Sequence, residues 1–211
     1  MLAKRASRTS GIGGMLEDAS DLMQSSRYTE AIVTLERAVA LDPSNKSTWE
    51  KVVTCNLEMK QPKKAIKALD KILDLEPRAG RVWADKAFLH LLLNENVQGI
   101  EALKQSLRLV PRNVKDWQLL STAFMANEQW DEAFNALETA LQLDPNSAIT
   151  WYNFAAASFF VGEYENALNA AERAFTIEPE LEQFSIDWIE NLREEYFDDD
   201  EHPSNFGVVA G

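Results

Sequence analysis

The chain has 211 residues, of which 45% are hydrophobic and 26% charged, and its formal net charge is −13. No apolar run reaches about 18 residues, which excludes a membrane-spanning helix, and the single cysteine excludes an internal disulfide framework. An isoelectric point near 4.6 argues against a nucleic-acid binder, because phosphate contacts need clustered basic side chains.

The charge is unevenly placed along the chain. Residues 1–16 carry three bases and no acid, and residues 178–201 carry eleven acids and one base, which leaves −6 for the body between them. We expect residues 1–11 to form a basic disordered arm. We expect residues 198–211 to form an acidic disordered tail, because like charges repel one another and no helical stripe is present.

The central part of the chain repeats itself every 34 residues. Prolines of this period are Pro43, Pro77, Pro111, Pro145 and Pro179, and tryptophans are Trp49, Trp83, Trp117 and Trp151. Three further columns are small in nearly every copy: Ala31, Ala65, Gly99, Ala133 and Ala167; Ala38, Ile72, Ser106, Ala140 and Ala174; and Ala19, Val53, Ala87, Ser121 and Ala155. So many aligned columns indicate a tandem array of one structural unit.

The spacing within one copy predicts two helices. In residues 114–147, one helical stripe runs from Trp117 to Phe124, and a second runs from Ala133 to Ala140. Small residues on both stripes let the two helices approach closely as an antiparallel pair, and the following proline ends the second helix. One pair has too little apolar surface to be stable alone, so successive pairs must stack.

This order of Trp, small, aromatic, Ala, Leu, Ala and Pro at a 34-residue period resembles the tetratricopeptide repeat (TPR) family. The resemblance implies an all-α fold, a right-handed α-solenoid of stacked helix-turn-helix pairs. We place five repeats at 12–45, 46–79, 80–113, 114–147 and 148–181. A capping helix is expected at 182–197, because an apolar stripe that includes Ile189 and Leu192 would close the stack.

Three features depart from the family pattern. Gly99 lies in the second helix of the third repeat, where it costs about 1 kcal/mol relative to alanine, so we expect this repeat to be the least stable. Lys86 occupies a position where a large apolar residue is expected. The glycines before Met15 predict that the first helix begins only there.

No group of residues in the sequence points to catalysis. His90 falls in an inter-helix packing column, which favours a structural role, and His202 lies in an acidic tail without fixed geometry for a metal. Cys55 has no histidine in its own helix pair and is expected to be a free thiol at the edge of the core. The sequence therefore predicts no enzyme, no cofactor and no metal site.

The resemblance implies that the first helix of each pair lines the concave side of the stack. Exposed apolar side chains that are contiguous on such a surface mark an interaction site. The predicted partner-binding residues are Leu57, Arg81, Phe88, Leu91, Lys115, Gln118, Thr122, Met125, Tyr152 and Phe159. The structural alternative is that several of these side chains pack between repeats instead. Arg81 and Lys115 would select for acidic residues in a partner.

One class of TPR protein does not fit the sequence. Members that hold the acidic C-terminal peptides of cytosolic chaperones use Lys, Asn and Arg on three successive inner helices as a two-carboxylate clamp. In the first three repeats these positions carry Leu16, Ser20, Lys51, Arg81 and Asp85, and the later triplets match no better. The sequence therefore argues against a chaperone-tail adaptor of that type.

We expect a non-catalytic protein–protein interaction scaffold or adaptor that holds a peptide or amphipathic helix of a partner in its concave groove. One alternative is a structural protein that self-assembles through head-to-tail contacts between its basic N-terminus and its acidic C-terminal region. Another is an assembly factor for a larger complex. One cysteine and no export signal make the cytoplasm the default location, and organelle targeting by the basic N-terminus stays open.

Overall fold

The computed structural model describes residues 11–184, 189 and 192, and every regular element within them is helical. The first helices of the successive pairs are α2 (Ile12–Gln24), α4 (Lys46–Glu58), α6 (Gly80–Leu92), α8 (Val114–Met125) and α10 (Ala148–Phe160). The second helices are α3 (Tyr28–Leu41), α5 (Pro62–Leu75), α7 (Asn96–Leu109), α9 (Trp130–Leu143) and α11 (Tyr164–Ile177), and a 3-10 helix, η1 (Pro179–Phe184), follows. The predicted all-α fold is confirmed, and the first helices begin one 34-residue period apart.

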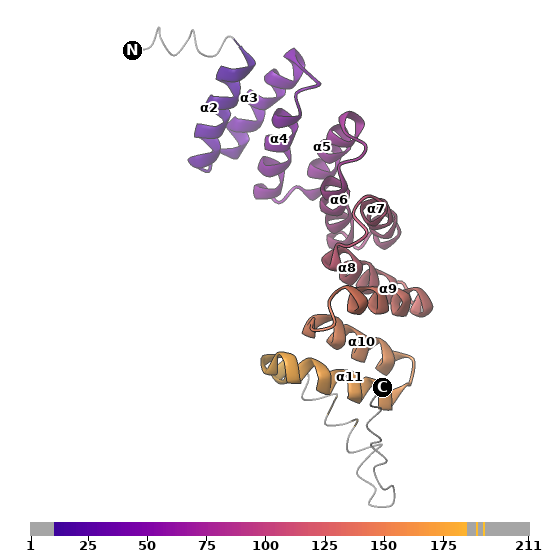
Figure 1. Ribbon diagram of the computed structural model, residues 1–211. Helices are drawn as coiled ribbons and strands as arrows, with labels where there is room; N and C mark the ends of the chain where they lie inside the picture. Colours follow the sequence, from indigo (N-terminus) through magenta and orange to yellow (C-terminus); the bar gives the residue numbers. More distant parts are fainter. Residues whose placement is uncertain (1–10, 185–188, 190–191, 193–211) are drawn as a thin grey trace, which may run out of the picture. The chain divides into compact units, whose positions relative to one another are not determined.

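The chain divides into two compact units, residues 1–119 and residues 120–211, with the boundary inside α8. In the first unit the helices from α2 to α7 pack in chain order, α2 against α3 and so on up to α6 against α7 (Figure 1). In the second unit α9 packs against α10, α10 against α11, and α11 against η1. No helix of the described part is long and apolar enough to cross a membrane.

The predicted small-residue columns form the core of both units. Ala31, Ala65, Ala133 and Ala167 are fully buried, and Gly99 in the same column is buried too. In the first unit Ala19, Ala31 and Leu35 pack with Cys55 in one cluster, and Ala65, Leu69, Ile72 and Leu89 form a second. In the second unit Ala155, Ala170, Ala171, Ala174 and Phe175 form the corresponding cluster. The helices of a pair therefore meet where their side chains are smallest.

A hydrogen bond joins the two residue types that mark the repeat. In four copies the indole Nε1 of the tryptophan donates to the carbonyl oxygen of the proline six residues earlier. The four bonds are Trp49 to Pro43 at 2.8 Å, Trp83 to Pro77 at 3.0 Å, Trp117 to Pro111 at 2.9 Å, and Trp151 to Pro145 at 2.9 Å. Each bond fixes the turn between repeats against the helix that follows.

The turn within each pair uses a left-handed backbone conformation. The residues concerned are Ser26, Lys60, Asn94 and Glu128, with φ of 56°, 55°, 58° and 57°, and Gly162, with φ of 81°. These five positions are again one period apart. A side chain at positive φ costs about 1–2 kcal/mol, and glycine avoids this cost.

The first helix begins at Ile12, so the prediction of a late start at Met15 is wrong. Gly13 and Gly14 lie inside the helix because Met15 and Ala19, one turn apart, are buried against the rest of the first unit. Burial of this apolar face outweighs the low helix propensity of the glycines.

Both ends of the chain carry predictions that lie outside the described residues. These are residues 1–10 of the basic arm, the acidic tail and most of the expected capping helix. The first residues of the expected capping helix, 182–184, belong to the 3-10 helix that starts at Pro179. Ile189 and Leu192 are helical and buried, and Ile189 packs into the core cluster of α10 and α11.

Close packing against α6 explains why the third pair has a glycine, Gly99, in its second helix. A Cβ atom on Gly99 would lie only 2.5 Å from Cδ2 of Leu91 and 2.6 Å from its Cγ. Leu91 of α6 therefore occupies the space that a side chain at this position would need. By contrast, a Cβ on Gly13 would meet no atom within 4 Å.

We expect Ser26→Gly and Gly162→Ser to have opposite effects on stability. Ser26→Gly relieves the left-handed strain and raises the free energy of unfolding by about 1 kcal/mol, and Gly162→Ser lowers it by a similar amount. A Cβ at Gly162 would meet no atom within 4 Å, so no clash adds to the second effect. Chemical denaturation of both variants checks the prediction, and changes of the same sign would contradict it.

We expect Gly99→Ala to destabilise the protein although alanine is the better helix former. Overpacking costs about 1–3 kcal/mol, which exceeds the gain of about 1 kcal/mol in helix propensity. In a Leu91→Ala background the clash is gone, so Gly99→Ala should then raise the free energy of unfolding. Gly13→Ala is the control for propensity alone and should be stabilising. A stabilising Gly99→Ala in the wild-type background would contradict this account.

Candidate functional site

The ten predicted partner-binding residues all lie on first helices, but they belong to two units. Leu57, Arg81, Phe88, Leu91, Lys115 and Gln118 lie in the first unit, and Thr122, Met125, Tyr152 and Phe159 lie in the second. Half of them are exposed and half are partly buried, and none is in the buried core. The two groups are therefore described as two separate surfaces.

The first unit presents an exposed stripe along α6, which we call the α6 stripe. It consists of Arg81, Asp85, Phe88 and Leu92, spaced at i, i+4, i+7 and i+11 along one helix face. Phe88 keeps 54% of its surface exposed and Leu92 keeps 61%. Asp85 and Leu92 were not among the predicted residues, although their spacing from Phe88 could have identified them. Leu57 on α4 is also exposed.

Two charged groups shift the pKa of Asp85 in the α6 stripe in opposite directions. The pKa of Asp85 is raised above its ordinary value of 3.8, chiefly because surrounding protein atoms desolvate the carboxyl group. The positive charge of Arg81 acts in the opposite direction, and the negative charge of Asp116 adds to the increase. Asp116 itself is buried, and Ser106 Oγ lies 2.6 Å from its Oδ2. Arg81 is thus partly neutralised by its own helix.

In the second unit the predicted aromatic residues contribute to packing. Tyr152 packs against the core cluster of α10 and α11. The ring of Phe159 lies 6.0 Å from that of Phe160 and 5.9 Å from that of Tyr164. Phe160 is 67% exposed, and its ring stacks on that of Trp130 with 5.7 Å between centroids. Phe160 was missed by the sequence analysis, although its position next to Phe159 was a signal.

The surroundings of three residues that stood out in the sequence explain their presence. His90 Nδ1 lies 2.7 Å from Glu95 Oε2, at the turn between α6 and α7. Cys55 is a free thiol, fully buried rather than at the core edge, and desolvation raises its pKa. Lys86 forms an ion pair with Asp70 of α5 at 2.6 Å, which explains a lysine at an expected apolar position. Among the described residues, no cluster of acidic, histidine and cysteine side chains could hold a metal ion.

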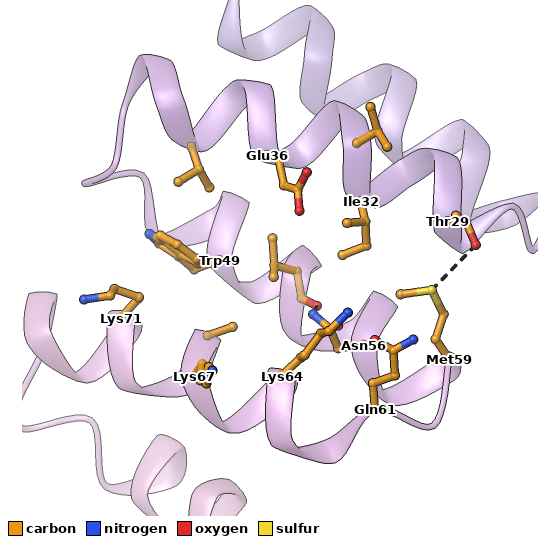
Figure 2. Close-up of a pocket in the computed structure, with 14 residues that line it drawn as sticks. Thr29, Ile32, Glu36, Trp49, Asn56, Met59, Gln61, Lys64, Lys67 and Lys71 are labelled. Carbon is orange, nitrogen blue, oxygen red and sulfur yellow. Dashed lines mark hydrogen bonds between the residues drawn. The ribbon is translucent and has the colours of Figure 1, made fainter.

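A groove between α3 and α5 was not foreseen from the sequence. It has a volume of about 570 Å³, and α4 contributes Trp49, Val52 and Asn56 to its lining. The α3 side carries Ile32, Val33, Glu36 and Val39, and the α5 side carries Lys64, Lys67, Ala68 and Lys71. In Figure 2 the three labelled lysines lie along α5 at the edge of this space, and Lys64 extends into it. We call this space the α3–α5 groove.

Comparison with known proteins finds a repeat-family match in part of the chain and similar solved structures. A family model of the tetratricopeptide repeat matches residues 114–157. A crystal structure of MamA has a TM-score of 0.70 at 18% identity, covering 78% of this chain and 96% of that chain. A structure of residues 41 to the end of MamA from Desulfovibrio magneticus RS-1 has a TM-score of 0.67 at 17% identity. This match covers 82% of this chain and 96% of that chain.

A third similar structure is that of YrrB, which is described as a TPR protein with an unusual peptide-binding site. Its TM-score is 0.68 at 17% identity, and the match covers 79% of this chain and 86% of YrrB. A search of curated proteins finds no match to the chain. At identities of 17–18%, the likeness to these structures establishes a shared fold.

We expect the change in stability caused by Asp85→Asn, relative to wild type, to depend on pH. A carboxyl group with a raised folded-state pKa binds its proton more tightly in the folded protein, so stability falls as pH rises through that pKa. Asp85→Asn removes this loss. Its Tm relative to wild type should therefore increase between pH 3.8 and pH 7.

Arg81→Gln is the matched variant, and its effect on Tm should have the opposite sign. It removes the charge that favours ionised Asp85, so its Tm relative to wild type should fall over the same pH range. Thermal unfolding at several pH values measures both differences. Parallel pH profiles for wild type and Asp85→Asn would contradict the assignment.

Proposed function

We propose that the chain, which shares the fold of tetratricopeptide repeat structures and matches that family's model over residues 114–157, is a non-catalytic interaction scaffold that binds a peptide or amphipathic helix of a partner protein. The contact surface would be formed by side chains on the first helices of the repeats. The observation that carries this proposal is the α6 stripe, where an aromatic and a leucine side chain lie exposed beside charged groups.

Phe88 is the expected anchor of the interaction. Full burial of a phenylalanine side chain contributes about 1.5–3 kcal/mol, and Phe88 already lies more than half in solvent. Aromatic side chains dominate the energetics of such interfaces. Exposed Leu57 of α4 would extend the apolar contact along the first unit.

The charged residues would set the preference for a partner. Arg81 is partly neutralised by Asp85, whereas Lys115 makes no ion pair within the described part of the chain. Lys115 would therefore contribute more to selection of acidic side chains than Arg81. Exposed cations of this kind influence association rate and specificity more than affinity.

The second unit would provide a separate contact. Phe160 is exposed and is held against Trp130, so its ring is presented without losing further rotamer freedom on binding. Phe159 and Tyr152 would support this surface mainly by packing behind it. The resemblance in fold to YrrB, whose structure is described as having a peptide-binding site, supports a peptide as the ligand class.

We expect Phe88→Ala to weaken binding of a partner peptide at least tenfold while the protein remains folded. The peptide is obtained by affinity capture on the full-length protein in an extract of its native source, followed by mass spectrometry and synthesis. Calorimetry then gives Kd for wild type and variant. Val97→Ala is the matched control, because Val97 is 67% exposed but lies on a second helix, α7. Equal affinities for wild type and Phe88→Ala would refute Phe88 as the anchor.

A further inference from the structure

The α3–α5 groove combines an apolar side with a basic side. Ile32 and Val39 are half-buried on α3, Val33 beside them is exposed, and Trp49 of α4 lies at one end of the space. Lys64, Lys67 and Lys71 line the opposite side, on α5. A ligand for such a groove needs apolar side chains for one wall and negative charge for the other.

Two of the three lysines are available for a ligand. Lys71 pairs with Asp74 at 3.0 Å, whereas Lys64 and Lys67 form no ion pair with any residue that the structure describes. Glu36 is the acidic residue on the α3 side, so the lining carries an excess of positive charge. This excess is notable because the body of the chain has a net charge of −6.

The chain itself contains a segment with the complementary composition. Residues 194–201 read Glu-Glu-Tyr-Phe-Asp-Asp-Asp-Glu, with six acids around two adjacent aromatic residues. We propose that the α3–α5 groove binds this segment, with Tyr196 or Phe197 against the apolar α3 side and the acids toward the lysines of α5. This inference goes beyond the proposed function, because it concerns second helices and a different surface.

The dimensions of the two partners agree. Lys64, Lys67 and Lys71 follow one another at i, i+3 and i+7 on one face of α5, a span of about 10 Å at the rise of an α-helix. The run from Asp198 to Glu201 also spans about 10 Å when extended. The acids can therefore lie along the lysines, and the aromatic residues that precede them reach the apolar wall.

The first experiment tests whether the segment lies at the groove in the full-length protein. Carbodiimide joins an amine to a carboxylate only when they are in direct contact, and mass spectrometry of the digest locates the link. We expect links from Lys64 or Lys67 to the carboxylates of 194–201, lost at high salt because surface ion pairs are screened. Mixing ¹⁴N- and ¹⁵N-labelled protein tells whether the same or a second molecule supplies the segment. Links spread evenly over Lys63 and Lys104 would overturn the proposal.

The second experiment measures affinity with a defined probe. A fluorescent peptide of residues 193–202 is titrated into the full chain that carries Tyr196→Ser and Phe197→Ser, so that its own segment does not compete. We expect Lys64→Gln/Lys67→Gln in this background to raise Kd about tenfold, from loss of two ion pairs and their steering charge. Lys63→Gln/Lys104→Gln removes the same charge from exposed positions outside the groove and should leave Kd unchanged.

Two further comparisons separate this proposal from its alternatives. A peptide with both aromatic residues replaced by serine should bind at least tenfold more weakly, and equal binding would mean charge attraction alone and would overturn the proposal. Phe88→Ala should not alter binding of the probe, because the α6 stripe is a different surface. The test therefore stands or fails independently of the proposed function.

Discussion

Close approach of paired helices is the constraint on which the rest of the structure depends. The helices of each pair meet through columns of buried alanine, serine and glycine, with leucine filling the space beside them. Such contacts leave no tolerance for added volume, because protein interiors are close-packed. At Gly99 the approach is so close that Leu91 occupies the place of the missing side chain. Each hairpin thereby becomes a packed unit that can stack on the next.

The connections between helices repeat as regularly as the helices themselves. Within a pair the chain turns through a left-handed residue, and between pairs the tryptophan indole holds the carbonyl of the preceding proline. These connections use backbone conformation and backbone carbonyl groups, so they place few demands on exposed side chains. The surface positions of the helices are therefore free to vary between repeats, and this variation makes the exposed surfaces of the repeats differ from one another.

The two surfaces of the first unit offer different chemistry to a ligand. The α6 stripe presents an exposed phenylalanine next to charges that partly cancel, which suits an apolar anchor. The α3–α5 groove presents lysines opposite an apolar wall, which suits an acidic ligand with aromatic residues. The proposed partner peptide and the proposed acidic ligand would thus meet different helices of the same repeats.

The sequence by itself determined the all-α fold, the 34-residue period and the buried columns, because small residues and prolines at fixed spacing act locally and in every copy. It also placed the exposed Phe88 on a first helix. Only the tertiary structure decided that Tyr152 supports packing and that the ring of Phe160 in the second unit is exposed. It also decided that helix α2 includes Gly13 and Gly14. The α3–α5 groove was likewise invisible in the sequence, because its two walls come from different repeats and meet only when the helices pack.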